Sequence, residues 1–130
     1  MKNPSDGNIL DAIYKEYYEK FRNYEQYPDT RDTKNYVPID CELIARQLQM
    51  DKHLLFGRLY YYLDKKHRYT QQDGSKVHLF AFQIGKDRHA VNFPLLAAVL
   101  AEHKLSFSRF LKPMLISCIA LFVSIWVALK

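Results

Sequence analysis

The sequence predicts an α+β protein: a small domain of helices and a two- or three-stranded hairpin, followed by a single C-terminal transmembrane helix. Apolar residues recur every three or four positions through most of the first 67 residues, which is typical of helices with one buried face. The spacing changes to two within residues 68–93, which is typical of strands. Residues 113–129 are apolar and carry no charge. A chain of 130 residues has room for one compact domain and this appendage.

Residues 1–37 are predicted to form an N-terminal helix and a loop. Ser5 or Asp6 can cap a helix over roughly residues 7–24, because its apolar residues follow helical spacing. The following sequence, EQYPDTRDTKNYVP, is rich in turn formers and charges. We therefore expect an exposed loop or a flexible connection there.

Residues 38–104 are predicted to form the compact domain. Asp40 can cap a short helix, CELIARQLQ, and Asp51 can cap a longer one that ends near His67. Residues 68–71 then lead through the turn signal at residues 73–74 into the strand VHLFAFQI, which gives a hairpin. A third short strand at residues 89–93 and a helix beginning at Pro94 complete the domain.

This order of elements resembles a winged helix-turn-helix domain. The first helix of the motif would be residues 39–49, the turn 50–53, the recognition-type helix 54–68, and the strands and wing 69–93. The resemblance covers about half of the chain and lies in the architecture alone. It implies a helix whose N-terminal residues enter the major groove of DNA.

Two kinds of partner are open for this domain. Cationic side chains could contact DNA from the longer helix and the hairpin. They are Lys52, His53, Arg58, Lys65, Lys66, Arg68, Lys76, Lys86 and Arg88. The helix is also dense in aromatic residues, with Tyr60, Tyr61 and Tyr62 in sequence, and tyrosines are enriched at protein interfaces. We expect a protein partner somewhat more than nucleic acid.

The sequence indicates no enzyme and no cofactor. Its five histidines are scattered, no phosphate-binding or nucleophile motif is present, and no cysteine–histidine cluster predicts a metal. Cys41 and Cys118 fall in different environments, so no disulfide is expected. The N-terminus lacks the apolar run of a secretory signal, which favours a cytoplasmic domain.

Residues 113–129 are predicted to cross a membrane, with residues 105–112 as a linker. At about 1.5 Å per residue the helix reaches roughly 25 Å, at the short end of what a bilayer needs. A buried core helix is the alternative, but a helix apolar on all sides is unusual in a small protein. Lys104, Arg109 and Lys112 precede the span, so the positive-inside rule predicts a tail-anchored, single-pass protein with a cytoplasmic N-terminal domain.

Small residues recur on one side of the predicted span and suggest contact between copies of the helix. They are Ser117, Ala120, Ser124 and Ala128. Chance recurrence in a stretch rich in Ala and Ser explains the pattern equally well. The predicted function is therefore a membrane-tethered, non-enzymatic interaction or adaptor module, with lipid and a protein as partners and with homo-oligomers as a possibility. The alternatives are a membrane-anchored DNA-binding regulator and an effector that perturbs the membrane.

Overall fold

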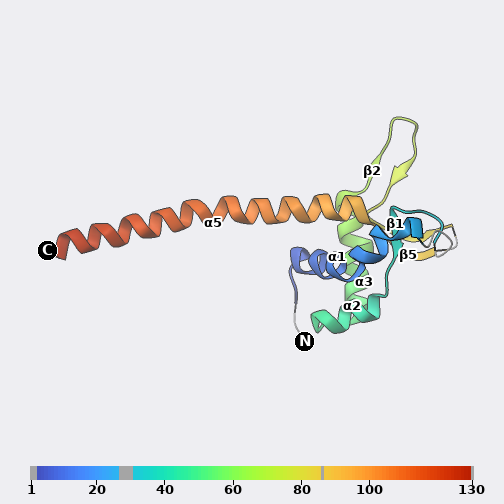
Figure 1. The fold of residues 1–130 in the computed structure, drawn as a ribbon, viewed down its shortest axis with the longest axis horizontal. Coiled ribbons are helices and arrows are strands. Elements are labelled where there is room, and N and C mark those ends of the chain that lie inside the picture. Colours follow the sequence, from blue (N-terminus) through green and yellow to red (C-terminus); the bar gives the residue numbers. More distant parts are fainter. Residues whose placement is uncertain (1–2, 27–30, 86, 130) are drawn as a thin grey trace. The chain divides into compact units, whose positions relative to one another are not determined.

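The computed structural model describes residues 3–26, 31–85 and 87–129. The chain forms two compact units, Met1–Leu100 and Ala101–Lys130 (Figure 1). The described residues form helices, two small antiparallel sheets and one long apolar C-terminal helix, which confirms the α+β class.

Helix α1 (Asp6–Arg22) belongs to the same unit as the domain that the sequence placed at residues 38–104. Ser5 caps it, because the Ser5 hydroxyl oxygen accepts a hydrogen bond from Asn8 N at 3.1 Å. Its apolar face supplies four core residues, which are Ile9, Leu10, Ile13 and Tyr17. A 3₁₀ turn, η1 (Tyr24–Gln26), follows.

Strand β1 (Tyr36–Pro38) lies in the segment where the sequence predicted an exposed loop or a flexible connection. That prediction is wrong for residues 36–38, which form a strand with Val37 fully buried. Residues 31–35 form no helix or strand, and Arg31 is the buried residue among them. A strand of three residues is too short to show alternation, and its partner strand lies more than fifty residues away in the chain. Residues 27–30 of the predicted loop lie outside the described part of the chain.

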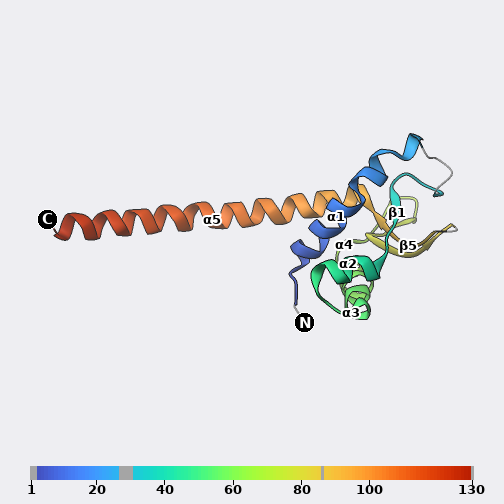
Figure 2. The same ribbon diagram turned by 60° about the horizontal axis from the view of Figure 1, so that its bottom comes forward.

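Helix α2 (Cys41–Leu48) begins where the sequence predicted. Asp40 caps it by accepting hydrogen bonds from Glu42 N at 3.0 Å and Leu43 N at 3.2 Å. Gln49 takes a left-handed conformation with φ of 57°, which ends the helix and turns the chain toward α3. Helix α2 contacts both α1 and α3 (Figure 2).

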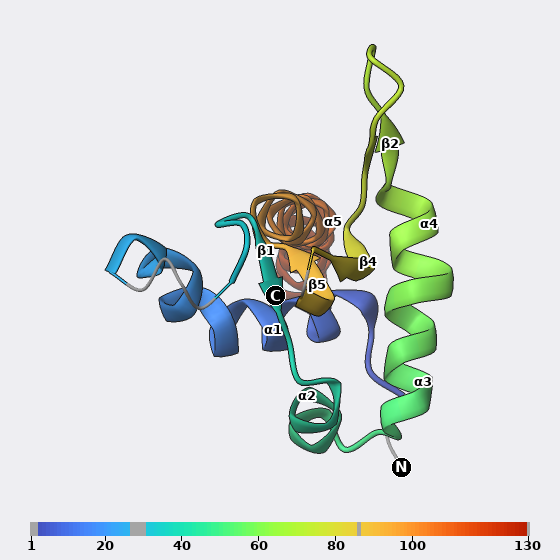
Figure 3. The same ribbon diagram turned by 90° about the vertical axis from the view of Figure 1, so that its right-hand side faces the viewer.

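The longer helix consists of α3 (Lys52–Gly57), a π-helical segment η3 (Arg58–Leu63) and α4 (Asp64–His67). Figure 3 shows these three pieces as one continuous helix. Asp51 caps its start through Oδ1, which accepts from His53 N at 2.8 Å and Leu54 N at 3.2 Å. The predicted helix is therefore present, and its centre is wound more widely than an α-helix.

The sequence predicted a hairpin between residues 68–71 and 77–84 and a third short strand at residues 89–93. The third strand is present at residues 87–92, but the run 77–84 is divided between two hairpins. A small hairpin pairs β2 (Tyr69–Thr70) with β3 (Lys76–Val77). A larger one pairs β4 (Phe80–Ile84) with β5 (Asp87–Asn92). The run VHLFAFQI is interrupted at residues 78–79 because the backbone N–H groups of Leu79 and Phe80 bind the Asp64 carboxylate.

The larger sheet has the strand order β1-β5-β4, so β5 is central and β4 lies at one edge (Figure 3). In register, Val37 faces Val91 across β1 and β5, and Phe80 faces Val91 across β4 and β5. One face of this sheet joins the helices in a single hydrophobic core, in which Phe80, Val91 and Phe93 are buried with α1 and the longer helix.

Helix α5 (Phe93–Leu129) begins one residue before the predicted Pro94, because the Asn92 side chain accepts a hydrogen bond from Leu95 N at 3.2 Å. Its first residues belong to the compact unit, where Leu96, Val99 and Leu100 are buried. The remainder forms the second unit. The predicted linker at residues 105–112 is helical, and Pro113 lies inside α5 rather than in the first turn of a new helix.

Helix α5 is the one helix of the described residues that is long and apolar enough to cross a membrane. The residues of its most apolar stretch are exposed throughout. No residue of the stretch that the sequence predicted as a span, residues 113–129, is buried.

Candidate protein-interaction surface

The longer helix buries a row of leucines, and its aromatic residues therefore lie on its outer side. Leu55, Leu59 and Leu63 recur every four positions, and each is at most 1% exposed. This spacing places them on one side of the helix, against the core. The residues between them, including the three consecutive tyrosines, are left on the outer side.

Phe56, Tyr60, Tyr61 and Phe82 form a cluster that we call the aromatic face. The Tyr60 ring centroid lies 5.4 Å from that of Phe56 and 5.0 Å from that of Tyr61. Phe82 reaches the cluster from β4, with its ring 6.3 Å from Tyr60. Tyr60, Tyr61 and Phe82 are 38%, 70% and 43% exposed, so the rings hold one another in place while offering apolar surface.

His89 supports the aromatic face from β5. Its ring lies 5.3 Å from Phe56, 6.0 Å from Phe80 and 5.5 Å from Phe82. Its backbone is left-handed, with φ of 52°, a conformation that His tolerates better than β-branched residues do. The sequence did not single out this packing role for His89.

The third tyrosine belongs to a different surface. Tyr62 is 50% exposed and lines an apolar pocket of about 540 Å³ together with Leu54, which is 56% exposed. Met50 and Gly57 also line this pocket. The predicted tyrosine cluster is therefore divided, with Tyr60 and Tyr61 on the aromatic face and Tyr62 beside it.

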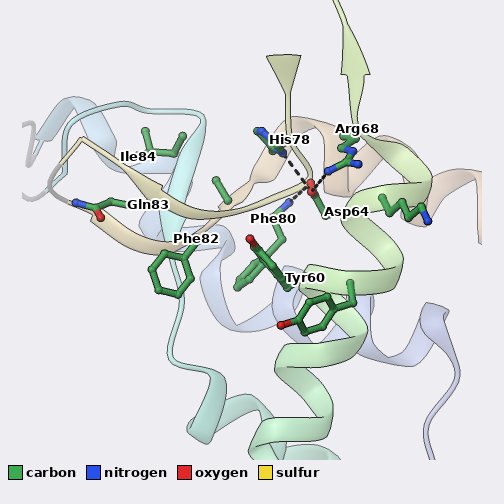
Figure 4. Close-up of a pocket in the computed structure, with 11 residues that line it drawn as sticks. Tyr60, Asp64, Arg68, His78, Phe80, Phe82, Gln83 and Ile84 are labelled. Atoms are coloured by element: carbon green, nitrogen blue, oxygen red, sulfur yellow. Dashed lines mark hydrogen bonds and ion pairs between the residues drawn. The ribbon is translucent and has the colours of Figure 1, made fainter. Parts of the chain in front are cut away.

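A groove of about 660 Å³ runs between the longer helix and β4, and we call it the edge groove (Figure 4). Tyr60 and Phe80 lie between its two walls. The helix contributes Tyr60, Tyr61, Asp64, Lys65 and Arg68, and the other wall contributes His78 and residues 80–84.

Asp64 fastens the two walls of the edge groove to each other. Its side chain is 4% exposed, and its Oδ1 atom accepts hydrogen bonds from Leu79 N at 2.9 Å and Phe80 N at 3.2 Å. Its Oδ2 atom lies 3.1 Å from His78 Nδ1 and 4.0 Å from Arg68 Nη1 (Figure 4). Because both oxygens have partners, the carboxylate is a structural tie with no lone oxygen directed at a ligand.

The predicted nucleic-acid residues are spread over separate surfaces. Lys52 and His53 are exposed at the start of the longer helix, and Lys76 is exposed on the small hairpin. Arg58 is engaged elsewhere, since its Nη2 atom lies 2.5 Å from Asp6 Oδ1 and its Nη1 atom 3.3 Å from Asn3 Oδ1. Lys86 lies outside the described residues.

The other predicted cations surround the aromatic residues. Lys65 and Arg68 line the edge groove, and Lys66 Nζ lies 6.0 Å from the Tyr62 ring centroid. The Arg88 guanidinium lies 5.3 Å from the Phe82 ring centroid. These cations therefore lie beside aromatic residues.

Arg31 is a residue that the sequence analysis missed. It is 2% exposed, and its guanidinium donates hydrogen bonds to four backbone carbonyl oxygens, at the end of α1 and before β1. They are those of Lys20 at 3.0 Å, Phe21 at 3.4 Å, Thr33 at 2.9 Å and Lys34 at 2.9 Å. Nothing in the pattern of a polar loop separates this buried arginine from a solvated one.

No group of three or more histidine, cysteine or acidic side chains among the described residues could hold a metal ion. Burial raises the pKa of the Cys41 thiol to about 11, so it carries little thiolate at neutral pH. Tyr17, whose pKa burial also raises, accepts a hydrogen bond from Asp40 N at 2.6 Å and thereby joins α1 to the start of α2.

The four small residues that the sequence predicted to contact another copy lie in the exposed C-terminal part of α5. Ser117, Ala120, Ser124 and Ala128 each have an exposed side chain. The Ser124 hydroxyl donates to the Ala120 carbonyl oxygen at 3.0 Å, so its polar atom is satisfied within its own helix.

No protein-family model, curated protein or solved structure shows a significant match to this chain.

Proposed function

We propose that this chain is a membrane-tethered protein-interaction module that binds its partner through the aromatic face. The observation that carries the proposal is the exposure of Tyr60, Tyr61 and Phe82 side by side on a rigid helix and strand. Large aromatic side chains with few rotatable bonds bind partners at low entropic cost. A contiguous aromatic patch on a small domain is typical of an interaction site.

The same surface argues for a protein partner over DNA. A helix that reads the major groove needs polar or cationic side chains on its outer side, in its N-terminal half. Lys52 and His53 are exposed at that end, but Leu54 beside them is an exposed apolar residue and Arg58 is paired with Asp6. Lys65, which lines the edge groove together with Tyr60, Tyr61 and Phe82, would suit an acidic partner.

We propose further that the domain is a variant of the winged helix. Its support is the order of elements: α1, then α2 and the longer helix joined by a tight turn, then the hairpin of β4 and β5 as the wing. The β2–β3 hairpin would be an addition between the recognition-type helix and the wing. Because many unrelated functions share one fold, this likeness adds no weight to DNA binding.

The membrane attachment is the third part of the proposal. The exposed apolar residues of α5 support a span at residues 113–129. The cations that precede it in the sequence, Lys104, Arg109 and Lys112, favour an N-terminal domain on the cytoplasmic side. Such a tether confines the interaction to the membrane surface and raises the effective concentration of the domain for partners there.

Site-specific photo-cross-linking in native membranes tests the interaction. A photoreactive phenylalanine derivative replaces Tyr61 in the full-length protein, and Glu19, exposed on α1, is the matched control position. We expect a discrete protein adduct from position 61 that weakens when Phe82→Ser is added, with none from position 19. Equal adducts from both positions, or none from position 61, would contradict a binding role for the aromatic face.

A gel-shift titration addresses DNA binding. The full-length protein in lipid nanodiscs is mixed with random duplex at low and high salt. Because phosphate contacts release counterions, DNA binding must weaken steeply as salt rises. We expect no salt-dependent shift, whereas a shift that Lys65→Ala with Lys66→Ala abolishes would favour the DNA-binding alternative.

A further inference from the structure

Two exposed cations border the aromatic face. Lys65 lines the edge groove together with Tyr61 and Phe82. Arg88 is exposed on β5, and its guanidinium lies over the Phe82 ring at 5.3 Å from the centroid. No ion pair joins either cation to another of the described residues. Their positive charges are therefore available to attract a ligand at the aromatic surface.

The acid of the edge groove is buried and already bonded. Asp64 is the one acid among the lining residues, and its side chain is 4% exposed. Its Oδ1 atom accepts from two backbone N–H groups, and its Oδ2 atom lies beside His78 and Arg68. The Arg68 side chain is itself 46% exposed, so the lining presents two cations, Lys65 and Arg68, against one covered carboxylate. The groove therefore favours an anion.

The rings beside these cations determine the other half of the ligand. Tyr61 and Phe82 expose most of the apolar surface of the aromatic face, so an apolar side chain that covers them is removed from water. Covering the rings also removes water from around Lys65 and Arg88, which strengthens their attraction for an opposite charge. Because Arg88 already packs on Phe82, it loses less side-chain freedom when it pairs with a ligand.

A protein segment fits this arrangement better than a nucleic acid does. Proteins that bind single strands follow the phosphate backbone with a row of cations and stack successive bases on aromatic rings. Here Arg58 is paired with Asp6 and Arg68 lies beside Asp64, which leaves Lys65 and Arg88 as separate charges around one aromatic cluster. A short segment of protein can present an apolar side chain and carboxylates within a few residues of each other.

We infer that the aromatic face and the edge groove bind an acidic segment of a partner protein, in which carboxylates flank an aromatic or large aliphatic residue. The apolar residue packs on Tyr61 and Phe82, and the carboxylates pair with Lys65 in the groove and with Arg88 beside the Phe82 ring. A basic segment is excluded because its charges would meet like charges at both positions. This inference rests on the proposed function and assigns the partner a chemistry.

Peptide selection on the full-length protein provides the test. The protein is held in nanodiscs of phosphatidylcholine, a lipid without net charge, and a phage-displayed library of random dodecapeptides is selected on it. We expect the enriched peptides to be acidic and to contain an aromatic or large aliphatic residue. The most enriched peptide is then synthesised and titrated by fluorescence anisotropy, and its affinity should fall as salt is raised.

Charge reversal tests the two assigned cations. Lys65→Glu and Arg88→Glu should each weaken binding of this peptide about tenfold, whereas Lys52→Glu, at an exposed cation outside the groove, should leave it unchanged. A second peptide, in which lysines replace the acids, should bind the Lys65→Glu variant more tightly than the wild type. Near-UV circular dichroism checks that each variant is folded.

Several outcomes would overturn the inference. They are failure to enrich any peptide, enrichment without acidic residues, and equal effects of Lys65→Glu and Lys52→Glu. An oligothymidylate that binds more tightly than the peptide would assign the surface to single-stranded nucleic acid instead.

Photo-cross-linking separates this inference from the proposed function. Lys65→Glu should also weaken the adduct that forms from position 61 in native membranes. An adduct that keeps its full intensity would remove the acidic partner and leave the proposed function standing. The absence of any adduct from position 61 would remove both.

Discussion

At the scale of single residues, two buried polar side chains organise the domain. Arg31 satisfies four carbonyl oxygens, two of them at the C-terminal end of α1, where helical carbonyls lack partners of their own. Asp64 satisfies two N–H groups at the start of β4. Removal of Asp64 would leave two buried N–H groups without this acceptor, and removal of Arg31 would take away four hydrogen bonds to partly buried carbonyl groups.

Arg31→Met should lower the free energy of unfolding by about 2–4 kcal/mol, because Met fills much of the same space but donates no hydrogen bond. Thermal melting of the full-length protein in mild detergent, followed by near-UV circular dichroism, measures this loss. Arg22→Ala is the control, since Arg22 is exposed and lies 4.0 Å from Glu19, and it should change stability by no more than about 0.5 kcal/mol. Equal effects of the two substitutions would contradict the role of Arg31.

Cys41 should react slowly with maleimide because burial raises its pKa from 9.0 to about 11. At pH 8 this shift lowers the thiolate fraction about a hundredfold relative to an unperturbed thiol. The rate measured on a Cys118→Ala background from pH 7 to 11 should still rise above pH 10. A rate that levels off near pH 9 would contradict the shift.

The same shift links Cys41 to stability. The unfolded chain releases its thiol proton near pH 9 and the folded chain near pH 11, so the unfolded state binds fewer protons between these values and stability falls as pH rises. Tyr17, with its pKa also raised, acts in the same direction. Cys41→Ala should reduce the loss of melting temperature between pH 9 and 11, whereas Cys118→Ala should not.

At the scale of elements, the longer helix and the β4–β5 hairpin act as one support for the aromatic face. Phe56 and Tyr60 come from the helix and Phe82 from the strand, and their rings are in mutual contact. Asp64 fixes the distance between the two elements by binding the backbone at the start of β4. The shape of the edge groove therefore depends on this one side chain.

Asp64→Ala should destabilise the protein by about 2–4 kcal/mol, since it leaves the buried N–H groups of Leu79 and Phe80 unsatisfied. Asp64→Asn should cost less, because its amide oxygen can still accept from both groups. Amide exchange at residues 79–80 and urea melting of the full-length protein measure the two effects. Lys66→Ala is the exposed control, and a loss of stability from it similar to that of Asp64→Ala would argue against a specific tie.

At the scale of the whole molecule, the chain combines a compact domain with an apolar helix that has no buried face in its second unit. An apolar helix of this kind is unfavourable in contact with water, so we expect a membrane or another apolar surface to cover it. In the proposed function, the membrane buries the apolar residues of α5. A partner bound to the aromatic face buries the exposed aromatic residues of the domain.

Phe122→Lys tests the span directly. A lysine near the middle of a membrane helix costs about 2.5–3.5 kcal/mol of insertion free energy, and this short segment has little to spare. We expect the variant to be extracted from membranes by alkaline carbonate, whereas wild type and Phe122→Leu remain in the pellet. Retention of the lysine variant would argue against residues 113–129 as a span.

Self-association of the helix is tested by Ser124→Leu combined with Ala128→Leu in a membrane two-hybrid assay. Larger side chains on this side would prevent close approach of two helices and lower the signal. Val123→Leu with Val127→Leu alters neighbouring positions and should leave the signal unchanged. If the Ser124 and Ala128 pair also has no effect, the small-residue stripe is not a contact.

The sequence by itself determined the features that depend on neighbouring residues. The caps at Asp40 and Asp51, the helical spacing of the buried leucines and the charge-free run before Lys130 are all local features, because a helix satisfies its backbone hydrogen bonds within one segment. For the first helix the sequence left Ser5 and Asp6 open, and the structure shows that Ser5 is the cap.

The tertiary structure alone decided what depends on residues far apart in the chain. It showed that Arg31 is buried, that β1 pairs with β5, and that Arg58 is paired with Asp6. It also placed Phe82 beside Tyr60 and Lys65 in the same groove as β4. Strand pairing and ion pairs can join residues at any distance along the chain, so no local sequence pattern predicts them. The proposed binding surface is built from contacts of this kind.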